Sequence, residues 1–453
     1  MDIIVAGCGK IGESIIGSLV SEDLNITVVD VDADVINDIT NIYDIIGVCG
    51  NAADYETLGE AGVEKAELFV AVTASDELNL LSCIMAKNMG AKHTIARIRN
   101  PQYTERSLGF IHQQLGLSMA INPELLAAKE LYNILKLPSA AKVEYFSRSH
   151  FEMVEIRVKP TSPLVGMTLA EVNNFCKAKM LVCLVQRDDE AFIPDGSFIL
   201  QANDKIHIAI TPSEMIKVLK QTKTMKKQSK NIMIVGGSRI SVYLAKMLLN
   251  SGANVKIIEA NRKRCKEICE HLPKAVVING DGAAQELLME EGLQNVDAFV
   301  ALTGTDEENI LTSLFANSKG VEKVIAKVNR NEHVKMAENL GLDCIISPKE
   351  TTSNVMIRYA RALKNSLGSN VETLYKLADG KAEALEFNVL PDSLLVGTPI
   401  KDLKIKPNII ISGIIRGKKT IIPSGEDVIL GGDRVIVTTR NQHLQDLSDI
   451  LKS

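Results

Sequence analysis

The sequence predicts an α/β protein in which one two-part unit occurs twice: a Rossmann-like, doubly wound parallel-sheet domain followed by a small, strand-rich α+β domain. Three observations predict this architecture. The chain matches itself at an offset of about 230 residues, so that 1–220 corresponds to 231–453. The first part of each repeat alternates short β-branched runs with helical segments. The second part of each repeat is smaller and dominated by strand patterns.

The internal match runs through both parts of the repeat. Leu68–Thr73 corresponds to Ala298–Thr303 in the first part, and Leu164–Gly166 corresponds to Leu395–Gly397 in the second. We therefore expect four domains. The Rossmann-like domains are 1–138 and 231–367, and the small domains are 139–222 and 368–453.

Short apolar runs and the helical segments between them predict parallel βαβ units in the first part. The predicted strands are Ile3–Ala6, Ile26–Val29, Ile45–Val48, Leu68–Val72 and Thr94–Ile98. The predicted helices are Glu13–Val20, Asp32–Ile39, Tyr55–Ala61 and Glu77–Met89. Because the strand cores are continuously apolar, we expect a sheet that helices cover on both faces.

The second part carries strand patterns at Phe151–Val158, Met180–Val185 and Lys205–Ile210. An amphipathic helix, Pro123–Leu135, is predicted between the two parts, with Pro138 as its stop signal. Its broad apolar face must be buried, either against its own repeat or against the neighbouring one.

A glycine-rich motif follows the first predicted strand and opens the first helix. It consists of Gly7, Cys8, Gly9, Lys10, Ile11 and Gly12. Gly7 permits a tight turn, Gly9 lets a phosphate approach the backbone, and Gly12 lets the helix pack close to the strand. The helix N-terminus offers free N–H donors and a positive dipole end to a diphosphate. The motif therefore predicts a site for an adenine nucleotide or dinucleotide.

Asp30 ends the second predicted strand, where an acidic residue accepts hydrogen bonds from the ribose diol of a dinucleotide. It would repel a 2′-phosphate, so NAD-type or adenosine ligands are favoured over NADP.

The carboxyl ends of the other strands add candidates, because ligands bind outside those ends in such sheets. These candidates are Asn51, Ala52, Thr73, Ala74 and Arg97. Arg97 has two interpretations: an ion pair with Asp76 or Glu77, or a phosphate contact through its guanidinium.

The second repeat departs from the motif. Its loop reads Gly236, Gly237, Ser238, Arg239, Ile240 and Ser241. Ser238 brings a Cβ atom toward the phosphate, Glu259 retains the acidic strand end, and Lys327 replaces the arginine. This second site binds more weakly, binds a different nucleotide, or is empty; the sequence leaves all three open.

Composition restricts the partners and the compartment. The net charge of −5 argues against nucleic acid. The chain has no apolar run long enough to cross a bilayer and no signal-peptide pattern at its start, so we expect a cytoplasmic protein. Cys265, Cys269 and His271 share a helical segment, but a structural zinc site needs a fourth ligand, so no metal is expected.

An NAD-dependent oxidoreductase is the alternative to a binding protein. Such an enzyme needs a proton-transfer group beside the nicotinamide. The histidines of the first small domain, His150 and His207, have no counterparts in the second repeat. A duplicated binding unit instead suits a ring with pseudo-symmetric contacts, which a ligand shifts between two shapes. We therefore expect a regulator that is not an enzyme.

Taken together, the motifs resemble the RCK (KTN) domain family, and their tandem arrangement resembles the TrkA family of peripheral subunits of the Trk potassium-uptake system. The resemblance covers nearly the whole chain. Besides the glycine motif, it is carried by Val28–Asp30, Gly50–Ala52, Leu58–Gly62, Val70–Thr73, Ser75–Asn79 and Ile95–Arg99. In that family, nucleotide positions would fall on Gly7–Ile11, Asp30, Thr73, Ala74 and Arg97, and on Gly236–Ile240 and Glu259.

The resemblance implies NAD(H) or ATP/ADP as a non-catalytic ligand and a homotetrameric ring. It also implies a TrkH-like integral membrane potassium channel or transporter subunit as the partner. The chain would then lie peripherally on the inner face of the cell membrane and gate that partner without turnover.

Overall fold

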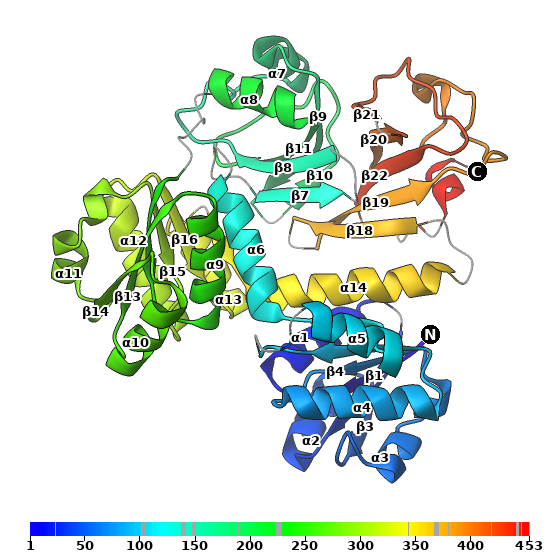
Figure 1. Ribbon diagram of the computed structural model, residues 1–453. Helices are drawn as coiled ribbons and strands as arrows, with labels where there is room; N and C mark the ends of the chain where they lie inside the picture. The colour runs from blue at the N-terminus through cyan, green and yellow to red at the C-terminus, as the bar shows by residue number, and fades with distance from the viewer. Residues whose placement is uncertain are drawn as a thin grey trace. The chain divides into compact units, whose positions relative to one another are not determined.

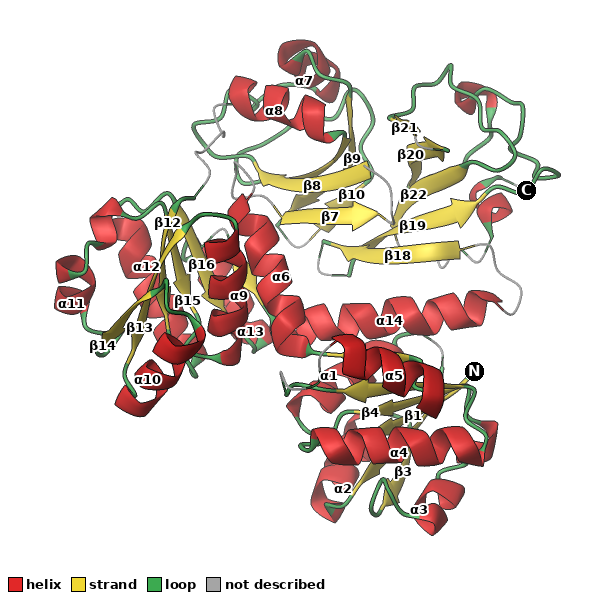
Figure 2. Ribbon diagram, viewed as in Figure 1, coloured by secondary structure: helices red, strands yellow, loops and turns green. Residues whose placement is uncertain are grey.

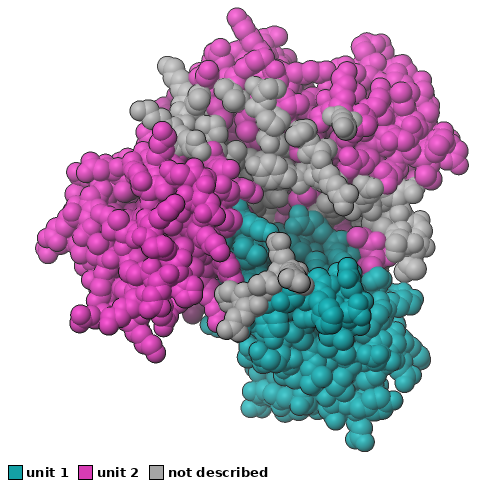
Figure 3. All heavy atoms as spheres, in the orientation of Figure 1, with its two compact units in different colours: residues 1–129, 346–360 teal, residues 130–345, 361–453 magenta. Residues whose placement is uncertain are grey.

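The computed structural model describes the chain except residues 23, 101–102, 104, 137–141, 147–150, 189, 223–228, 343, 367–370, 379, 418, 441–443, 445 and 453. The described chain divides into two compact units (Figure 3). Unit 1 contains Met1–Lys129 and Ile346–Ala360, and unit 2 contains Glu130–Ile345 and Arg361–Ser453. The stop signal at Pro138 and the expected domain limits near 138 and 367 lie outside the described residues.

Unit 1 is built on a six-stranded sheet with the order β3-β2-β1-β4-β5-β6. All of its strand pairs are parallel. The strands are β1 Asp2–Ala6, β2 Asn25–Asp30, β3 Ile46–Cys49, β4 Leu68–Ala71, β5 His93–Arg97 and β6 Met119–Ile121. The order reverses between β1 and β4, and such a switch point is where nucleotides bind in doubly wound sheets.

Five helices connect these strands (Figure 1). They are α1 Lys10–Val20, α2 Ala33–Ile42, α3 Tyr55–Glu60, α4 Asp76–Met89 and α5 Glu105–Leu115. All four residues of β4 are buried, as are Ile3–Ala6 of β1, so side chains on both faces of the sheet are covered. Continuous burial of this kind is what the apolar strand cores predicted.

Unit 2 contains a second six-stranded sheet with the matching order β14-β13-β12-β15-β16-β17. Its strands are β12 Asn231–Val235, β13 Asn254–Glu259, β14 Val276–Asn279, β15 Ala298–Ala301, β16 Lys323–Lys327 and β17 Ile345–Ile346. Its helices are α9 Arg239–Asn250, α10 Arg262–His271, α11 Gln285–Glu290, α12 Asp306–Ser318 and α13 Asn331–Asn339. The repeated Rossmann-like fold class is therefore confirmed.

Two five-stranded antiparallel sheets complete unit 2, with the orders β10-β9-β11-β8-β7 and β18-β19-β22-β20-β21 (Figure 2). The first contains β7 Lys142–Phe146, β8 Phe151–Arg157, β9 Met180–Arg187, β10 Glu190–Phe192 and β11 Lys205–Ile210, with helices α7 Leu169–Cys176 and α8 Pro212–Gln221. The second contains β18 Val371–Leu377, β19 Ala382–Asn388, β20 Ile409–Arg416, β21 Lys419–Ile421 and β22 Arg434–Arg440.

The two small sheets share one apolar core. Phe151 and Met153 from the first sheet cluster with Leu377 and Ile436 from the second. A Cβ atom at Gly413 would lie 2.3 Å from the Phe151 ring, so glycine makes room for this phenyl group. The strand-rich parts of the two repeats therefore pack as one body.

Two helices, α6 Pro123–Lys136 and α14 Pro348–Ser366, each have one part in unit 1 and the other part in unit 2. In unit 1, Ser353 of α14 lies 3.0 Å from Ser14, Oγ to Oγ, and the ring of Tyr359 meets the His93 ring edge-on at 6.3 Å. In unit 2, the buried ammonium of Lys323 donates to the carbonyl of Ile134 at 2.9 Å. The end of the predicted helix 123–135 is thus buried against the neighbouring repeat.

None of the helices in the described part of the chain combines the length and the apolar character needed to cross a membrane.

Candidate functional site

The first candidate site begins at the tight turn after β1. Gly7 donates its N–H to the carbonyl of Val29 at 2.8 Å and has a φ of +97°, a conformation that favours glycine. A Cβ atom at this position would lie 2.7 Å from the amide nitrogen of Thr73. Gly7 therefore serves the tight turn that the motif predicted.

Gly9 and Gly12 shape the start of α1. Gly9 is the N-cap residue and offers no side chain to the helix N–H groups, and a Cβ atom there would have no neighbour within 4 Å. At Gly12 a Cβ atom would lie 1.9 Å from the carbonyl oxygen of Gly7. The helix N-terminus is thus open at Gly9 and tightly packed at Gly12, as a phosphate-binding turn requires. Lys10 is exposed beside it, and Ile11 is half-buried.

Asp30 orders this turn. Its Oδ2 atom accepts the amide of Cys8 at 2.7 Å, and its Oδ1 atom accepts the amide of Asp32 at 3.1 Å. Burial, together with the charge of Asp30, raises the pKa of the Cys8 thiol to about 12. Cys8 therefore stays a neutral thiol and acts as a buried apolar residue, not as a nucleophile.

The ends of β4 and β5 are joined by the buried side-chain amide of Asn79, which was not among the predicted site residues. Asn79 accepts the amide of Thr73 at 2.8 Å and donates to the carbonyl of Arg97 at 2.9 Å. The guanidinium of Arg97 also donates to the Thr73 carbonyl. Asp76, one of the suggested ion-pair partners of Arg97, accepts the amides of Arg99 and Asn100 at 2.8 and 2.7 Å. Asn79 could have been found from its recurrence as Asn309.

The other predicted residues lie at the same edge of the sheet with separate roles. Asn51 is exposed, and its Oδ1 atom accepts the amide of Ala53 at 2.9 Å, while Ala52 is buried. Ala74 is exposed, and its carbonyl accepts from Arg99 at 2.7 Å. Asn51 and Ala74 are therefore exposed at this edge of the sheet, whereas Ala52 belongs to the hydrophobic core.

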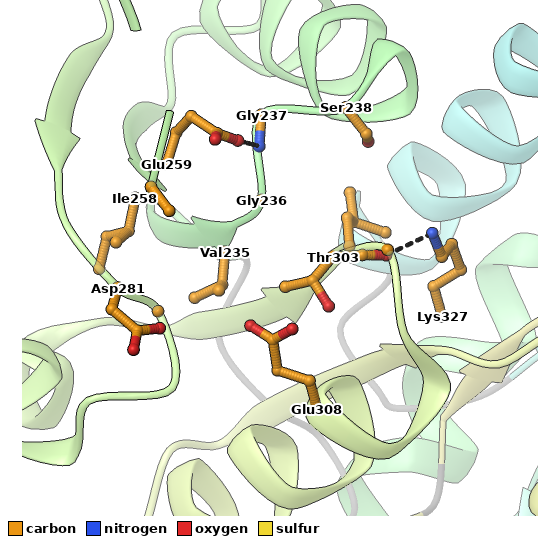
Figure 4. Close-up of a pocket in the computed structure, with 14 residues that line it drawn as sticks. Val235, Gly236, Gly237, Ser238, Ile258, Glu259, Asp281, Thr303, Glu308 and Lys327 are labelled. Atoms are coloured by element: carbon orange, nitrogen blue, oxygen red, sulfur yellow. Dashed lines mark hydrogen bonds between the residues drawn. The ribbon is translucent and has the colours of Figure 1, made fainter. Parts of the chain in front are cut away.

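The second repeat contains a cavity of about 370 Å³ at the corresponding place (Figure 4). It is lined by Val235, Gly236, Gly237, Ser238, Ile258, Glu259, Ala260, Asp281, Gly282, Leu302, Thr303, Gly304, Glu308 and Lys327. Four of the predicted site residues line it: Gly236, Gly237, Ser238 and Glu259. Arg239 is exposed and Ile240 is buried, and neither is among the lining residues.

Serines change the helix start in the second site. Ser238 is the N-cap of α9, and its hydroxyl accepts the amide of Ser241 at 3.2 Å. The hydroxyl of Ser241 donates to the carbonyl of Gly236 at 2.5 Å. The helix N-terminus that is bare at Gly9 is thus capped from within the protein here.

Glu259 has the same structural role as Asp30. It accepts the amide of Gly237 at 2.6 Å through Oε2 and that of Asn261 at 2.6 Å through Oε1. Arg264 donates to the carbonyl of Gly237 at 2.8 Å, so a cation lies next to this turn as well. The acidic strand end is therefore retained in both repeats.

Lys327 lines the cavity at the place of Arg97. Its ammonium donates to the carbonyl of Thr303 at 2.6 Å, and Asn309 joins the two strand ends as Asn79 does. Burial lowers the pKa of Lys327, and the charge of Asp306 offsets part of that effect.

Two acidic side chains in this cavity were not selected from the sequence. Asp281 and Glu308 line it together with Glu259 (Figure 4). Their counterparts in the first repeat are Asn51 and Leu78, which are uncharged. A position-by-position comparison of the two repeats could have identified both residues, because each change adds a negative charge to the same edge of the sheet.

No cluster of three or more potential metal ligands is present among the described residues. In the cysteine–histidine segment, the ring of His271 contacts the carbonyl of Glu267 at 2.7 Å, Cys265 is buried and Cys269 is exposed.

Both parts of each repeat match known protein families. The TrkA-N domain family matches residues 3–123 and 232–348, and the TrkA-C domain family matches 153–223 and 384–452. The chain is 33% identical to "Trk system potassium uptake protein TrkA homolog 1" of Methanosarcina mazei, over 96% of this chain and 97% of that protein. It is 31% identical to the Vibrio alginolyticus protein named TrkA, over 98% of this chain and 96% of that one.

Solved structures share the fold. The structure titled "GsuK channel bound to NAD" has a TM-score of 0.62 at 18% identity and covers 97% of this chain and 77% of that one. The GsuK RCK domain alone gives the same TM-score and identity, with coverage of 97% and 92%. The relatives are named as potassium uptake proteins and not as oxidoreductases. The chain therefore belongs to the TrkA family, with two TrkA-N and two TrkA-C domains in tandem.

Proposed function

We propose that the chain is a nucleotide-binding regulatory subunit of a potassium uptake system. The observation that carries the proposal is the first glycine turn, where Gly9 leaves the α1 N-terminus bare and Asp30 lies at the end of β2. A diphosphate would bind the free N–H groups of that helix, and Asp30 would accept the ribose diol. NAD(H) and ATP/ADP both offer this chemistry, so both are candidate ligands.

The partner in this proposal is an integral membrane potassium channel or transporter subunit of the TrkH type. The family name of the relatives supports it, as does the structural likeness to a channel that binds NAD. The chain would then act on the inner face of the membrane through that partner. The four-domain division at 138, 222 and 367 remains part of this proposal.

A homotetrameric ring is the proposed assembly. Matching places in the two repeats expose large apolar side chains: Leu81 on α4 and Leu311 on α12, and Phe110 on α5 and Leu340 directly after α13. Exposed apolar groups at equivalent places suit contacts between repeats in a symmetric ring. Sedimentation equilibrium of the purified protein tests this stoichiometry, and a monomer at micromolar concentration would contradict it.

Ligand binding must favour one shape of the ring to have an effect. A diphosphate at Gly9–Gly12 would change the adjacent βα loops, and α6 is the proposed transmitter. This helix starts in the chain segment of unit 1 and continues past Lys129 into that of unit 2. A ligand that binds both shapes equally well would shift nothing.

Potassium flux through the reconstituted partner tests the proposal. Adding nucleotide should change the flux, and Asp30→Ala should weaken the nucleotide affinity by roughly 10- to 100-fold, because hydrogen bonds to a charged group contribute about 1.5–3 kcal/mol. Asp38→Ala removes the same charge from an exposed position on α2 and should leave the response unchanged. Equal responses from both variants would refute the role of Asp30.

A further inference from the structure

We propose that the second cavity takes an adenosine nucleoside without a phosphate chain, and that Asp281 and Glu308 determine this preference. The inference rests on the proposed function, because it assigns a ligand class to the second copy of the same kind of site. It goes beyond that function by giving the two repeats different ligands.

The cavity of the second repeat is lined by acidic side chains. Glu259, Asp281 and Glu308 line one space of about 370 Å³ (Figure 4). Asp281 follows β14, and Glu308 lies in the first turn of α12, where its carboxylate accepts the hydroxyl of Thr305 at 3.1 Å. Asp281 is exposed and Glu259 and Glu308 are half-buried, so all three negative charges lie on the lining of the space that a ligand would occupy. A diphosphate would add its own negative charges to these carboxylates.

The cationic groups near the cavity have other partners. The ammonium of Lys327 donates to the Thr303 carbonyl at 2.6 Å. The guanidinium of Arg264 donates to the Gly237 carbonyl at 2.8 Å and pairs with Glu267 at 2.9 Å. These contacts hold both cations on protein oxygens, so a phosphate chain would have to compete for them.

The N-terminus of α9 is capped by a side chain of the protein. The hydroxyl of Ser238 takes the amide of Ser241, which belongs to the N–H groups that a diphosphate would use. In the first repeat Gly9 leaves the equivalent groups without a side-chain cap. Relative to the first site, the second site therefore has one phosphate donor fewer, the amide of Ser241, and two additional carboxylates, Asp281 and Glu308.

What the second site keeps is the means to bind a ribose. Glu259 ends β13 as Asp30 ends β2, and its carboxylate accepts two backbone amides. A carboxylate has about four acceptor positions, so a diol can still bind to it. A cavity of about 370 Å³ is near the small end of the roughly 300–1,000 Å³ found for ligand sites, a size that suits a nucleoside better than a dinucleotide.

Calorimetry on the full-length protein tests the inference with two probes. The unaltered chain should bind one NAD, and adenosine added at saturating NAD should fill one further site per chain. The double variant Asp281→Asn, Glu308→Gln should bind a second NAD, with an affinity gain on the order of 100-fold, about tenfold for each removed charge. Both substitutions keep the side-chain shape, and thermal unfolding of the double variant checks that it folds.

Glu307→Gln is the matched control, because Glu307 precedes Glu308 on α12, is largely exposed and is not among the lining residues. It should leave NAD binding at one per chain. Two NAD molecules on the unaltered chain would overturn the inference, and so would an absence of further adenosine binding at saturating NAD. A chain that binds no NAD would refute the proposed function instead, while adenosine binding would still decide the inference.

Discussion

The two glycine turns of this chain have the same backbone course but differ in the side chains around them. Gly7 and Gly236 have φ values of +97° and +95°, and each donates to the strand that follows its helix, at 2.8 Å. Beyond that turn the first repeat presents a bare helix end, whereas the second presents a capped helix end and additional carboxylates. The geometry of the turn is therefore the same in both repeats, whereas the cap of the following helix and the charge of the surrounding side chains differ.

The largest effect should come from filling the tightest contact of the first turn. In Gly12→Val the Cβ atom would lie 1.9 Å from the Gly7 carbonyl oxygen, so the helix must move away from β1. We expect loss of measurable NAD binding by calorimetry and destabilisation of about 1–3 kcal/mol, as for other overpacked sites.

Gly59→Ala is the control for that variant, since a Cβ atom on this exposed residue of α3 has no neighbour within 4 Å. It should leave NAD binding unchanged. Gly12→Ser gives the first repeat the residue that the second repeat has at this position. There, Ser241 donates to the Gly236 carbonyl. Undiminished NAD binding by Gly12→Val would show that the close contact is not needed.

An intermediate effect should follow from exchanging the helix caps. Gly9→Ser would place a hydroxyl over the first N–H groups of α1, which stabilises the unliganded helix by a few tenths of a kcal/mol and competes with phosphate. We expect NAD affinity about tenfold lower, as measured by calorimetry. The reverse change, Ser238→Gly, should lower stability slightly without creating NAD binding, because the carboxylates remain. If Ser238→Gly alone admits a second NAD, the cap and not the charge excludes it.

The smallest effect concerns the pH dependence of stability, in which Lys327 should differ from Arg97. Burial lowers the pKa of Lys327 below its ordinary 10.5, whereas an arginine remains charged. Between the lowered pKa and about 10.5 the unfolded chain binds this proton more readily, so stability rises with pH across that window. Lys327→Met should remove this rise in urea unfolding curves, and an unchanged slope would show that the lysine does not titrate differently on folding.

Segments with a clear apolar run were predictable from the sequence. The five predicted strands of the first sheet appear within one or two residues of the predicted limits, because each contains such a run. Strand β6 was not predicted, because three residues are too short to show a period. The helix α5, which has eleven residues, was also not predicted.

In the candidate site, the sequence predicted those residues whose identity the backbone geometry dictates. Gly7 and Gly12 are required by positive φ and by close packing, so the motif located them. The amide clamps formed by Asn79 and Asn309, and the acidic residue Glu308, depend on which strand end a helix start faces. That information lies in the folded arrangement and becomes visible in the sequence only when the repeats are compared residue by residue.

The first part of α14, up to Ala360, belongs to unit 1, and this has a consequence for how the chain can be divided. A fragment that ends with the first repeat would lack Ile346–Ala360, and with it the Ser353 hydroxyl and the Tyr359 ring that meet Ser14 and His93. The repeated sequence unit and the compact structural unit are therefore different stretches of polypeptide. We expect a ribosome-bound first domain to gain its full set of contacts only after α14 has been synthesised.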